Sequence, residues 1–297
     1  MSTETASGET ETTMRGAGDA MDDAVAAVPL DATAFRGLVY EKAAACWRDL
    51  PWRRDADPYA IMVSEMMLQQ TQVPRVAPKF LSWMGRFPDI GSLAAATVDE
   101  VLSYWSGLGY NRRALALHRS GQIIVSDFGG EVPQDETTLR SLPGIGVYTS
   151  RAILAFAFDR PTVFLETNIR TVLLKHFFPE ETGVSDRALE GIAAQVLDAA
   201  APRLWYTALM DYGSELKRVE GNHSARGAAY KKQAPFATSF RRVRGAVLKR
   251  LVEGKKVPID ELYASLPFSR ETIERCASAL VKEGFAAYEG DSLKISG

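Results

Sequence analysis

Two glutamates occupy surroundings that favour opposite protonation states of a carboxyl group. Glu65 follows Val63 closely and precedes Met66 and Met67, so it is a single carboxylate inside an otherwise apolar segment with helical spacing. Burial disfavours the charged form, and a carboxyl group placed there can keep a proton and donate it. Glu166 follows an apolar run and begins a predicted helix, whose dipole favours an ionised side chain. One proton donor and one ionised carboxylate are the pair that acid-assisted hydrolysis requires.

A glycine-containing bend lies between two apolar helical segments, with the sequence Leu142-Pro143-Gly144-Ile145-Gly146-Val147-Tyr148. A Gly-x-Gly bend leaves backbone N–H groups exposed at a helix N-terminus. These groups can donate hydrogen bonds to a phosphate oxygen and do not recognise a particular base. Gly144 and Gly146 are therefore predicted to contact a nucleic-acid backbone. Taken alone, the motif is equally compatible with a turn that only closes a helical hairpin.

Five motifs occur in an order that is typical of one group of DNA repair enzymes. Together they resemble the helix-hairpin-helix superfamily of DNA glycosylases (endonuclease III-like) and, within it, the adenine DNA glycosylases, which act on A·G and A·8-oxoguanine mismatches. The resemblance extends from about residue 50 to about residue 216. In chain order the motifs are Pro51-Trp52-Arg53, the segment Val63–Val73, Gly107-Leu108-Gly109-Tyr110, the glycine hairpin with Leu165-Glu166-Thr167-Asn168, and Met210-Asp211-Tyr212-Gly213.

The resemblance implies roles for four catalytic residues. Glu65 would donate a proton to adenine N7, and Glu166 would stabilise the cationic sugar, where the family has an aspartate that is one methylene shorter. Asn168 stands at a second polar position of the family's active site. Tyr148 replaces the lysine nucleophile of the strand-cutting relatives, and a phenol cannot form a Schiff base, so the enzyme is expected to be monofunctional. From the sequence alone, a plain N-cap or ion-pair role for Glu166 is the less favoured alternative, whereas simple helix packing of Tyr148 is equally compatible with the periodicity.

The resemblance also implies residues that hold the DNA and the flipped base. Trp52, Arg53 and Asp211 match positions around the adenine pocket. The remaining matches are predicted to insert into the base stack or to lie near the opposite base, although Trp52 and Leu108 are also compatible with a plain core role. These predicted DNA contacts are Gln69, Gln70, Thr71, Leu108 and Tyr110, together with the two hairpin glycines.

Composition and periodicity predict an all-α, two-lobed helix-hairpin-helix core followed by a small winged-helix (α+β) domain. Helical spacing dominates from Ala34 to Leu216, and helices over 242–252, 259–265 and 269–282 with a hairpin over 285–295 are typical of a winged helix. The predicted divisions are a disordered acidic tail (1–32), the glycosylase core (33–216), a basic linker in place of a cluster loop (217–239) and the winged-helix domain (240–297).

Charge is distributed unevenly along the 297 residues, whose formal net charge is −2. Seven acidic residues face one arginine in residues 1–32, whereas twelve Lys or Arg face two glutamates between Lys217 and Lys256. This basic segment is predicted to contact DNA phosphates, or else to be a solvated linker. Many relatives carry an iron–sulfur cluster held by four cysteines, but this chain has only two cysteines, so neither that cluster nor another cofactor is expected.

These observations predict a cytoplasmic, monomeric enzyme that binds double-stranded DNA with mismatched or oxidised bases. The chain has 46% apolar residues, no apolar run long enough to cross a bilayer, and no signal-peptide pattern at its N-terminus. The predicted function is hydrolysis of adenine from mismatches with G or 8-oxoguanine. Two alternatives stay open: a thymine glycosylase acting on T·G mismatches, and a protein that binds mismatched DNA without cutting it.

Overall fold

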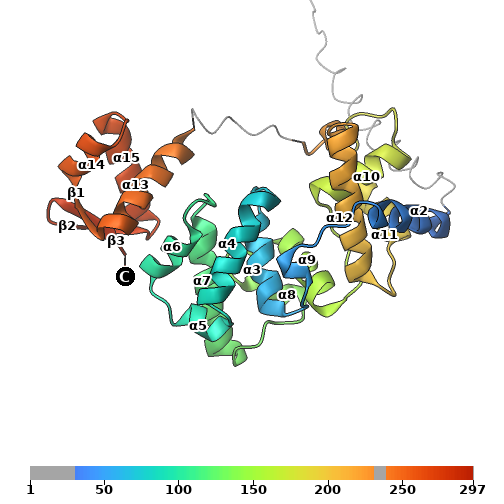
Figure 1. Cartoon of the computed structure of the whole chain (residues 1–297), viewed down its shortest axis with the longest axis horizontal. Coiled ribbons are helices and arrows are strands. Elements are labelled where there is room, and N and C mark those ends of the chain that lie inside the picture. The colour runs from blue at the N-terminus through green and yellow to red at the C-terminus, as the bar shows by residue number, and fades with distance from the viewer. Residues whose placement is uncertain (1–30, 231–238, 297) are drawn as a thin grey trace, which may run out of the picture. The chain divides into compact units, whose positions relative to one another are not determined.

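The computed structural model describes residues 31–230 and 239–296 (Figure 1). The predicted acidic tail therefore lies almost entirely outside the described residues. The chain forms two compact units, each built from two separate stretches of sequence. The described part of unit 1 comprises residues 31–48 and 159–230, and that of unit 2 comprises residues 49–158 and 239–296. The four domain boundaries expected from the sequence stay a prediction.

Unit 1 is a group of helices packed around α12. Helix α10 packs along α12, and α2 crosses α12 as well. Edge-to-face contacts of Phe35 with Phe177 and Trp205 fill the space between these helices. The elements of unit 1 are α2 (Ala32–Ala44), α10 (Thr167–Phe177), α11 (Asp186–Val196), α12 (Pro202–Val219) and the 3₁₀ helix η2 (His223–Arg226).

Gly213 allows α10 and α12 to approach unusually closely. A Cβ atom at position 213 would lie 2.3 Å from the carbonyl oxygen of Asn168 and 2.7 Å from its carbonyl carbon. Both obstacles are backbone atoms, which cannot rotate away as a side chain can. The glycine of the Met210–Gly213 motif is therefore required by helix packing next to the start of α10.

The N-terminal part of unit 2 is also helical, with α3 at its centre. Helix α3 packs against α9, α4 and α7, and every residue from Tyr59 to Met67 is buried. A helix that is apolar around its whole circumference is expected in such a central position. The elements are η1 (Pro51–Arg53), α3 (Pro58–Leu68), α4 (Val73–Arg86), α5 (Ile90–Ala94), α6 (Val98–Trp105), α7 (Arg112–Phe128), α8 (Glu136–Ser141) and α9 (Val147–Phe158).

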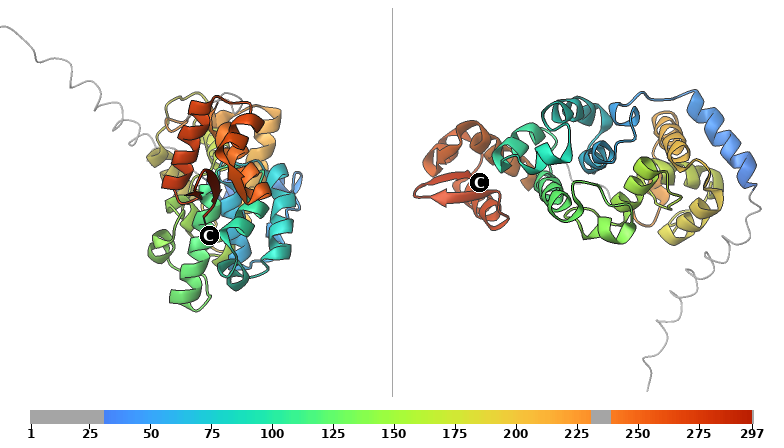
Figure 2. Two further views of the ribbon diagram at one scale, coloured as in Figure 1. Left: turned by 90° about the vertical axis from the view of Figure 1, so that its left-hand side faces the viewer. Right: turned by 90° about the horizontal axis from the view of Figure 1, so that it is seen from below.

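The C-terminal part of unit 2 is a small α+β domain. Its antiparallel sheet has the order β1-β3-β2, with Leu293 of β3 paired to Val257 on one side and to Tyr288 on the other. The sheet lies beside helices α13 to α15 in both views of Figure 2. The elements are α13 (Phe240–Gly254), β1 (Lys256–Pro258), α14 (Ile259–Ser265), α15 (Arg270–Lys282), β2 (Ala286–Glu289) and β3 (Ser292–Ile295).

This architecture confirms the predicted fold class, an all-α core with a small winged-helix domain. Within the described ranges, the core holds no named strand, and its single isolated β-bridge pairs Val184 with Gly227. No helix of the described ranges is long and apolar enough to cross a membrane.

Candidate active site

Glu65 lies in the middle of α3 and is almost completely buried. The helix begins at an Asp57 N-cap, whose side chain accepts a hydrogen bond from Ala60 N at 2.9 Å, and Pro58 occupies its first turn. Only 4% of the Glu65 surface is exposed. The Tyr148 hydroxyl, at the start of α9, donates a hydrogen bond to Glu65 Oε2 over 3.0 Å. The phenol therefore fixes one oxygen of a buried carboxyl group.

The glycine hairpin packs directly on the helix that carries Glu65. Gly144 has a φ of +78°, and a Cβ atom there would lie 2.8 Å from both Met66 Cε and Ala116 Cβ. No atom would come within 4 Å of a Cβ at Gly146, so that side of the bend is open. Gly144 is therefore needed for the backbone conformation and for the packing of the bend on α3, which places Tyr148 beside Glu65. Gly146 leaves the backbone on the other side of the bend accessible.

Glu166 is the N-cap of α10 in unit 1 and contacts the polar residue that was predicted beside it. Glu166 Oε2 accepts the backbone N–H of Asn168 at 2.6 Å, and Oε1 accepts Asn168 Nδ2 at 3.2 Å. Desolvation raises the pKa of Glu166, while the Asn168 N–H and the nearby Lys217 and Arg170 act in the opposite direction. The carboxylate is thus held by the start of its own helix, and Asn168 is oriented by it.

Arg170 fixes the segment that leads into Glu166. Its guanidinium donates a hydrogen bond to Leu165 O at 3.2 Å and forms an ion pair with Asp186 at 2.8 Å.

Asp211, on α12, is buried and binds Arg48 through both of its carboxylate oxygens. Oδ1 accepts a hydrogen bond from Arg48 Nε at 2.6 Å, and Oδ2 accepts one from the backbone N–H of Arg48 at 3.0 Å. A predicted pocket residue therefore also connects α12 to the chain after α2.

The predicted DNA contacts of α3 and the following turn all lie in unit 2. Gln69, which ends α3, donates to Thr149 Oγ1 at 3.0 Å, whereas Gln70 is exposed and has a φ of +55°. Thr71 Oγ1 accepts a hydrogen bond from Arg113 Nη2 at 3.0 Å. In the Gly107–Tyr110 loop, Leu108 is buried, and Tyr110 is partly exposed with a φ of +49°.

The remaining predicted residues divide between the two units. Trp52 is buried with its ring edge-to-face with Phe80, at 5.6 Å between centroids, and Arg53 follows it in η1 of unit 2. The structure therefore brings Glu65, Tyr148, the hairpin, the Gln69–Thr71 turn and Tyr110 together in unit 2. It brings Glu166, Asn168 and Asp211 together in unit 1.

Arg113 is a site residue that the sequence analysis did not identify. Its buried guanidinium donates to the carbonyls of Met66 and Met67 at 2.7 and 2.9 Å, to Thr71 Oγ1 and to Gly109 O at 3.1 Å. Burial lowers the pKa of Arg113 to about 10. The helix C-terminus of α3, which carries negative partial charge, stabilises the cation. Arg113 therefore joins the Glu65 helix to the loop that carries Tyr110. The sequence offered little signal for it, because Arg113 directly follows Asn111 and Arg112 at the start of a helix.

The segment after α12 does not have the donors that an iron–sulfur cluster would need. The sequence has two cysteines, and Cys46 and Cys276 belong to different units. Within residues 31–230 and 239–296, no group of three or more His, Cys, Asp or Glu is placed to hold a metal ion. Arg226 instead fixes this segment, because its guanidinium donates to the carbonyls of Leu174, Phe178 and Pro179 at the end of α10. The residues of this segment do not supply the four thiolates that the cluster needs.

Comparison with known proteins identifies the family. Residues 63–196 match the HhH-GPD superfamily of base excision DNA repair proteins. An adenine DNA glycosylase of Mycolicibacterium smegmatis is 32% identical over 265 residues, which is 82% of this chain and 89% of that protein. The chain belongs to the adenine DNA glycosylase family.

Other relatives show how much of the family this chain spans. The adenine DNA glycosylase of Homo sapiens is 38% identical over 197 residues, which cover 62% of this chain and 36% of the human protein. The chain therefore spans most of the mycobacterial relative but little more than a third of the human one. Among solved structures, a thermostable thymine-DNA glycosylase matches 62% of this chain and 86% of its own, with a TM-score of 0.54 and 22% identity. That likeness describes the fold.

Proposed function

We propose that this adenine DNA glycosylase family member hydrolyses the N-glycosidic bond of adenine mispaired with G or 8-oxoguanine. The observation that supports this most directly is the buried Glu65 carboxyl group held by the Tyr148 hydroxyl at 3.0 Å. A carboxyl group in that position can carry a proton to a base that has been flipped out of the helix.

In the proposed reaction, Glu65 protonates adenine N7 and the C1′–N9 bond breaks, so that the bonding electrons leave with the base. A water molecule then adds to C1′ of the oxocarbenium-like sugar and passes its proton back to a carboxylate. Tyr148 orients the Glu65 carboxyl group. Glu166, oriented with Asn168, supplies the negative charge that stabilises the cationic sugar.

The product of this reaction is an abasic site in an uncut strand. Strand cutting by the superfamily's lyases begins with attack of an amine on C1′, which needs a lysine nucleophile. Tyr148 stands at that place in α9, and its hydroxyl is used to hold Glu65. We therefore propose a monofunctional glycosylase.

Single-turnover base release tests this function. Duplexes carry A opposite G, A opposite 8-oxoguanine and T opposite G, and alkali is added afterwards to cleave abasic sites. We expect adenine release from the first two duplexes, with strand cleavage only after alkali. Thymine release alone would assign the chain to the T·G enzymes, and tight binding without release would indicate a non-catalytic mismatch binder.

The Glu65→Gln variant tests the assigned acid. Because the glutamine cannot donate the proton, we expect the rate of base release to fall about 10²- to 10⁴-fold while duplex binding is retained. Glu131→Gln is the matched control, since it makes the same chemical change at an exposed position of unit 2. Unchanged release by Glu65→Gln would remove Glu65 from the mechanism.

A further inference from the structure

The C-terminal domain contacts the loop that carries Tyr110. Arg241, in the first turn of α13, donates a hydrogen bond from Nη1 to the Tyr110 hydroxyl, and its guanidinium lies 5.3 Å from the centre of the Tyr110 ring. The Arg113 guanidinium lies 5.4 Å from the same ring. Tyr110, the aromatic residue predicted to enter the base stack, therefore interacts with one arginine from the core and one from the winged-helix domain.

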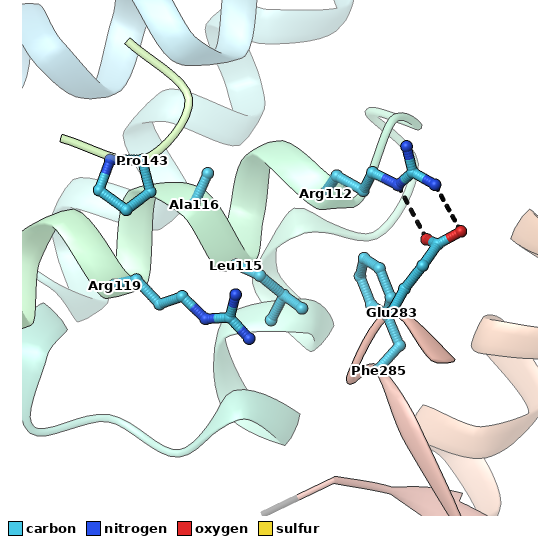
Figure 3. Close-up of a pocket in the computed structure, with 7 residues that line it drawn as sticks. All are labelled: Arg112, Leu115, Ala116, Arg119, Pro143, Glu283 and Phe285. Atoms are coloured by element: carbon cyan, nitrogen blue, oxygen red, sulfur yellow. Dashed lines mark hydrogen bonds and ion pairs between the residues drawn. The ribbon is translucent and has the colours of Figure 1, made fainter. Parts of the chain in front are cut away.

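A double ion pair holds the domain at this loop. The carboxylate of Glu283, at the end of α15, accepts hydrogen bonds from Arg112 Nε and Nη2 at 2.8 and 2.5 Å. It also accepts hydrogen bonds from Arg244 Nη1 and Nη2 at 3.0 and 2.6 Å. Hydrogen bonds from Arg112 and Arg244 lower the pKa of Glu283 to about 2. Figure 3 shows Arg112 and Glu283 at a cavity of about 220 Å³. Since Arg112 is two residues after Tyr110, this ion pair fixes the spacing between Arg241 and the loop.

The other elements of the winged-helix domain carry charges of both signs. Its expected recognition helix, α15, exposes Glu271 and Glu274 together with three basic residues, Arg270, Arg275 and Lys282. Glu289, at the end of β2, is paired with Lys256 and Lys294. The first turn of α13, by contrast, holds Arg241, Arg242 and no acidic residue, and this end of the domain contacts Tyr110.

We propose that Arg241 is a specificity-determining residue that reads the guanine opposite the excised adenine. The proposal rests on the proposed function and on the predicted position of Tyr110 in the stack beside the orphaned base. An arginine bound to the Tyr110 hydroxyl is then carried to the edge of that base. Guanine presents two acceptors, O6 and N7, to a bidentate guanidinium, whereas cytosine presents a donor and adenine a donor with one acceptor. In 8-oxoguanine N7 carries a hydrogen and is a donor, so the adjacent O6 and N7 acceptor pair is lost and the acceptors O6 and O8 lie on either side of it.

The test compares single-turnover adenine release from duplexes with G, 8-oxoguanine or C opposite the adenine. We expect Arg241→Gln to reduce the ratio of the A·G to the A·C rate by about tenfold or more, because one bidentate pair discriminates by that order. Arg241→Lys keeps the charge but not the paired donors, so it should lower the same ratio. The reduction should be smaller for 8-oxoguanine.

Two further variants separate a specific contact from general charge. Arg242→Gln removes the same charge one residue away, where the guanidinium lies 5.3 Å from the Phe268 ring instead, and it should leave the ratio unchanged. Tyr110→Phe retains the ring but removes the hydroxyl that binds Arg241, and should lower the ratio while stacking persists. An equal fall in Arg242→Gln would show that only net charge matters and would overturn the proposal.

Binding provides a readout that does not depend on base release. Affinity is measured for duplexes with an abasic-site analogue opposite G or C, and the preference for G should be reduced by Arg241→Gln. If wild-type protein released no adenine, the proposed function would fail while this binding preference could still be present. An unchanged preference in Arg241→Gln would overturn the inference alone. Faster release from every duplex would also overturn it, because Arg241 would then restrain Tyr110 rather than read a base.

Discussion

The two glutamates of the candidate active site are held in opposite ways. Glu65 lies inside a buried helix, and a hydroxyl from another helix fixes it at 3.0 Å. Glu166 lies at the beginning of a helix, and the backbone N–H of that same helix fixes it at 2.6 Å. A group that must carry a proton benefits from burial, while one that must be ionised benefits from N–H donors and nearby cations. The position of Glu166 at a helix start supplies N–H donors that favour its ionised form, although desolvation still raises the pKa of this carboxyl group.

Shortening Glu166 is expected to have the largest effect on this comparison. In Glu166→Asp the carboxylate withdraws by one methylene, and a displacement of about 1 Å can cost about 10²-fold in rate. Aspartate is a good N-cap, so the fold should tolerate the change. Single-turnover adenine release measures the loss, and Glu190→Asp, at an exposed position of unit 1, is the control. A faster variant would show that the site is built for the family's aspartate and that glutamate is a handicap here.

Removing the hydroxyl that orients Glu65 should have a smaller effect. Tyr148→Phe retains the ring and loses one hydrogen bond to a buried carboxyl group, which should slow release about tenfold. Tyr288→Phe makes the same change at an exposed tyrosine of β2. If release by Tyr148→Phe matched that of the control, the 3.0 Å contact would be one of packing only.

The pH dependence of release should report Glu166. Desolvation raises the pKa of this carboxyl group, and the proposed reaction needs its ionised form. Release should therefore begin to fall, as the pH is lowered, at a higher pH than the usual titration of a glutamate. A profile of single-turnover rates should show this acid limb, and Glu166→Gln should lack it. An acid limb that persists in that variant would assign the titration to another group.

The local signals in the sequence located both glutamates and their helices correctly, because a helix start and an apolar run depend on neighbouring residues. Glu166 is the N-cap of α10, Glu65 lies within α3, and the expected helix over 259–265 is α14. The hairpin glycines were recognised from spacing, although the packing of Gly144 on Met66 was not visible. The predicted roles of these residues stay predictions.

Contacts between distant segments could not be predicted in this way. Arg113, Arg226 and Arg241 each bind a partner that lies between 42 and 131 residues away along the chain, and no local pattern marks those partners. In the basic segment 217–256, too, ion pairs with residues outside the segment could not be predicted from the sequence. Arg244 and Arg250 are paired with Glu283 and Glu261, which lie outside the segment. Counting charges along the sequence therefore overstated how much of this positive charge is available for DNA.

The backbone contact at Gly213 has a consequence for motion. Side chains between two helices can change rotamer and let the helices slide, but α10 and α12 meet at Asn168 and Gly213 with no such layer between them. The two helices should therefore move as one body. Whatever rearrangement unit 1 undergoes, Glu166 at the start of α10 and Asp211 on α12 should therefore keep their spacing.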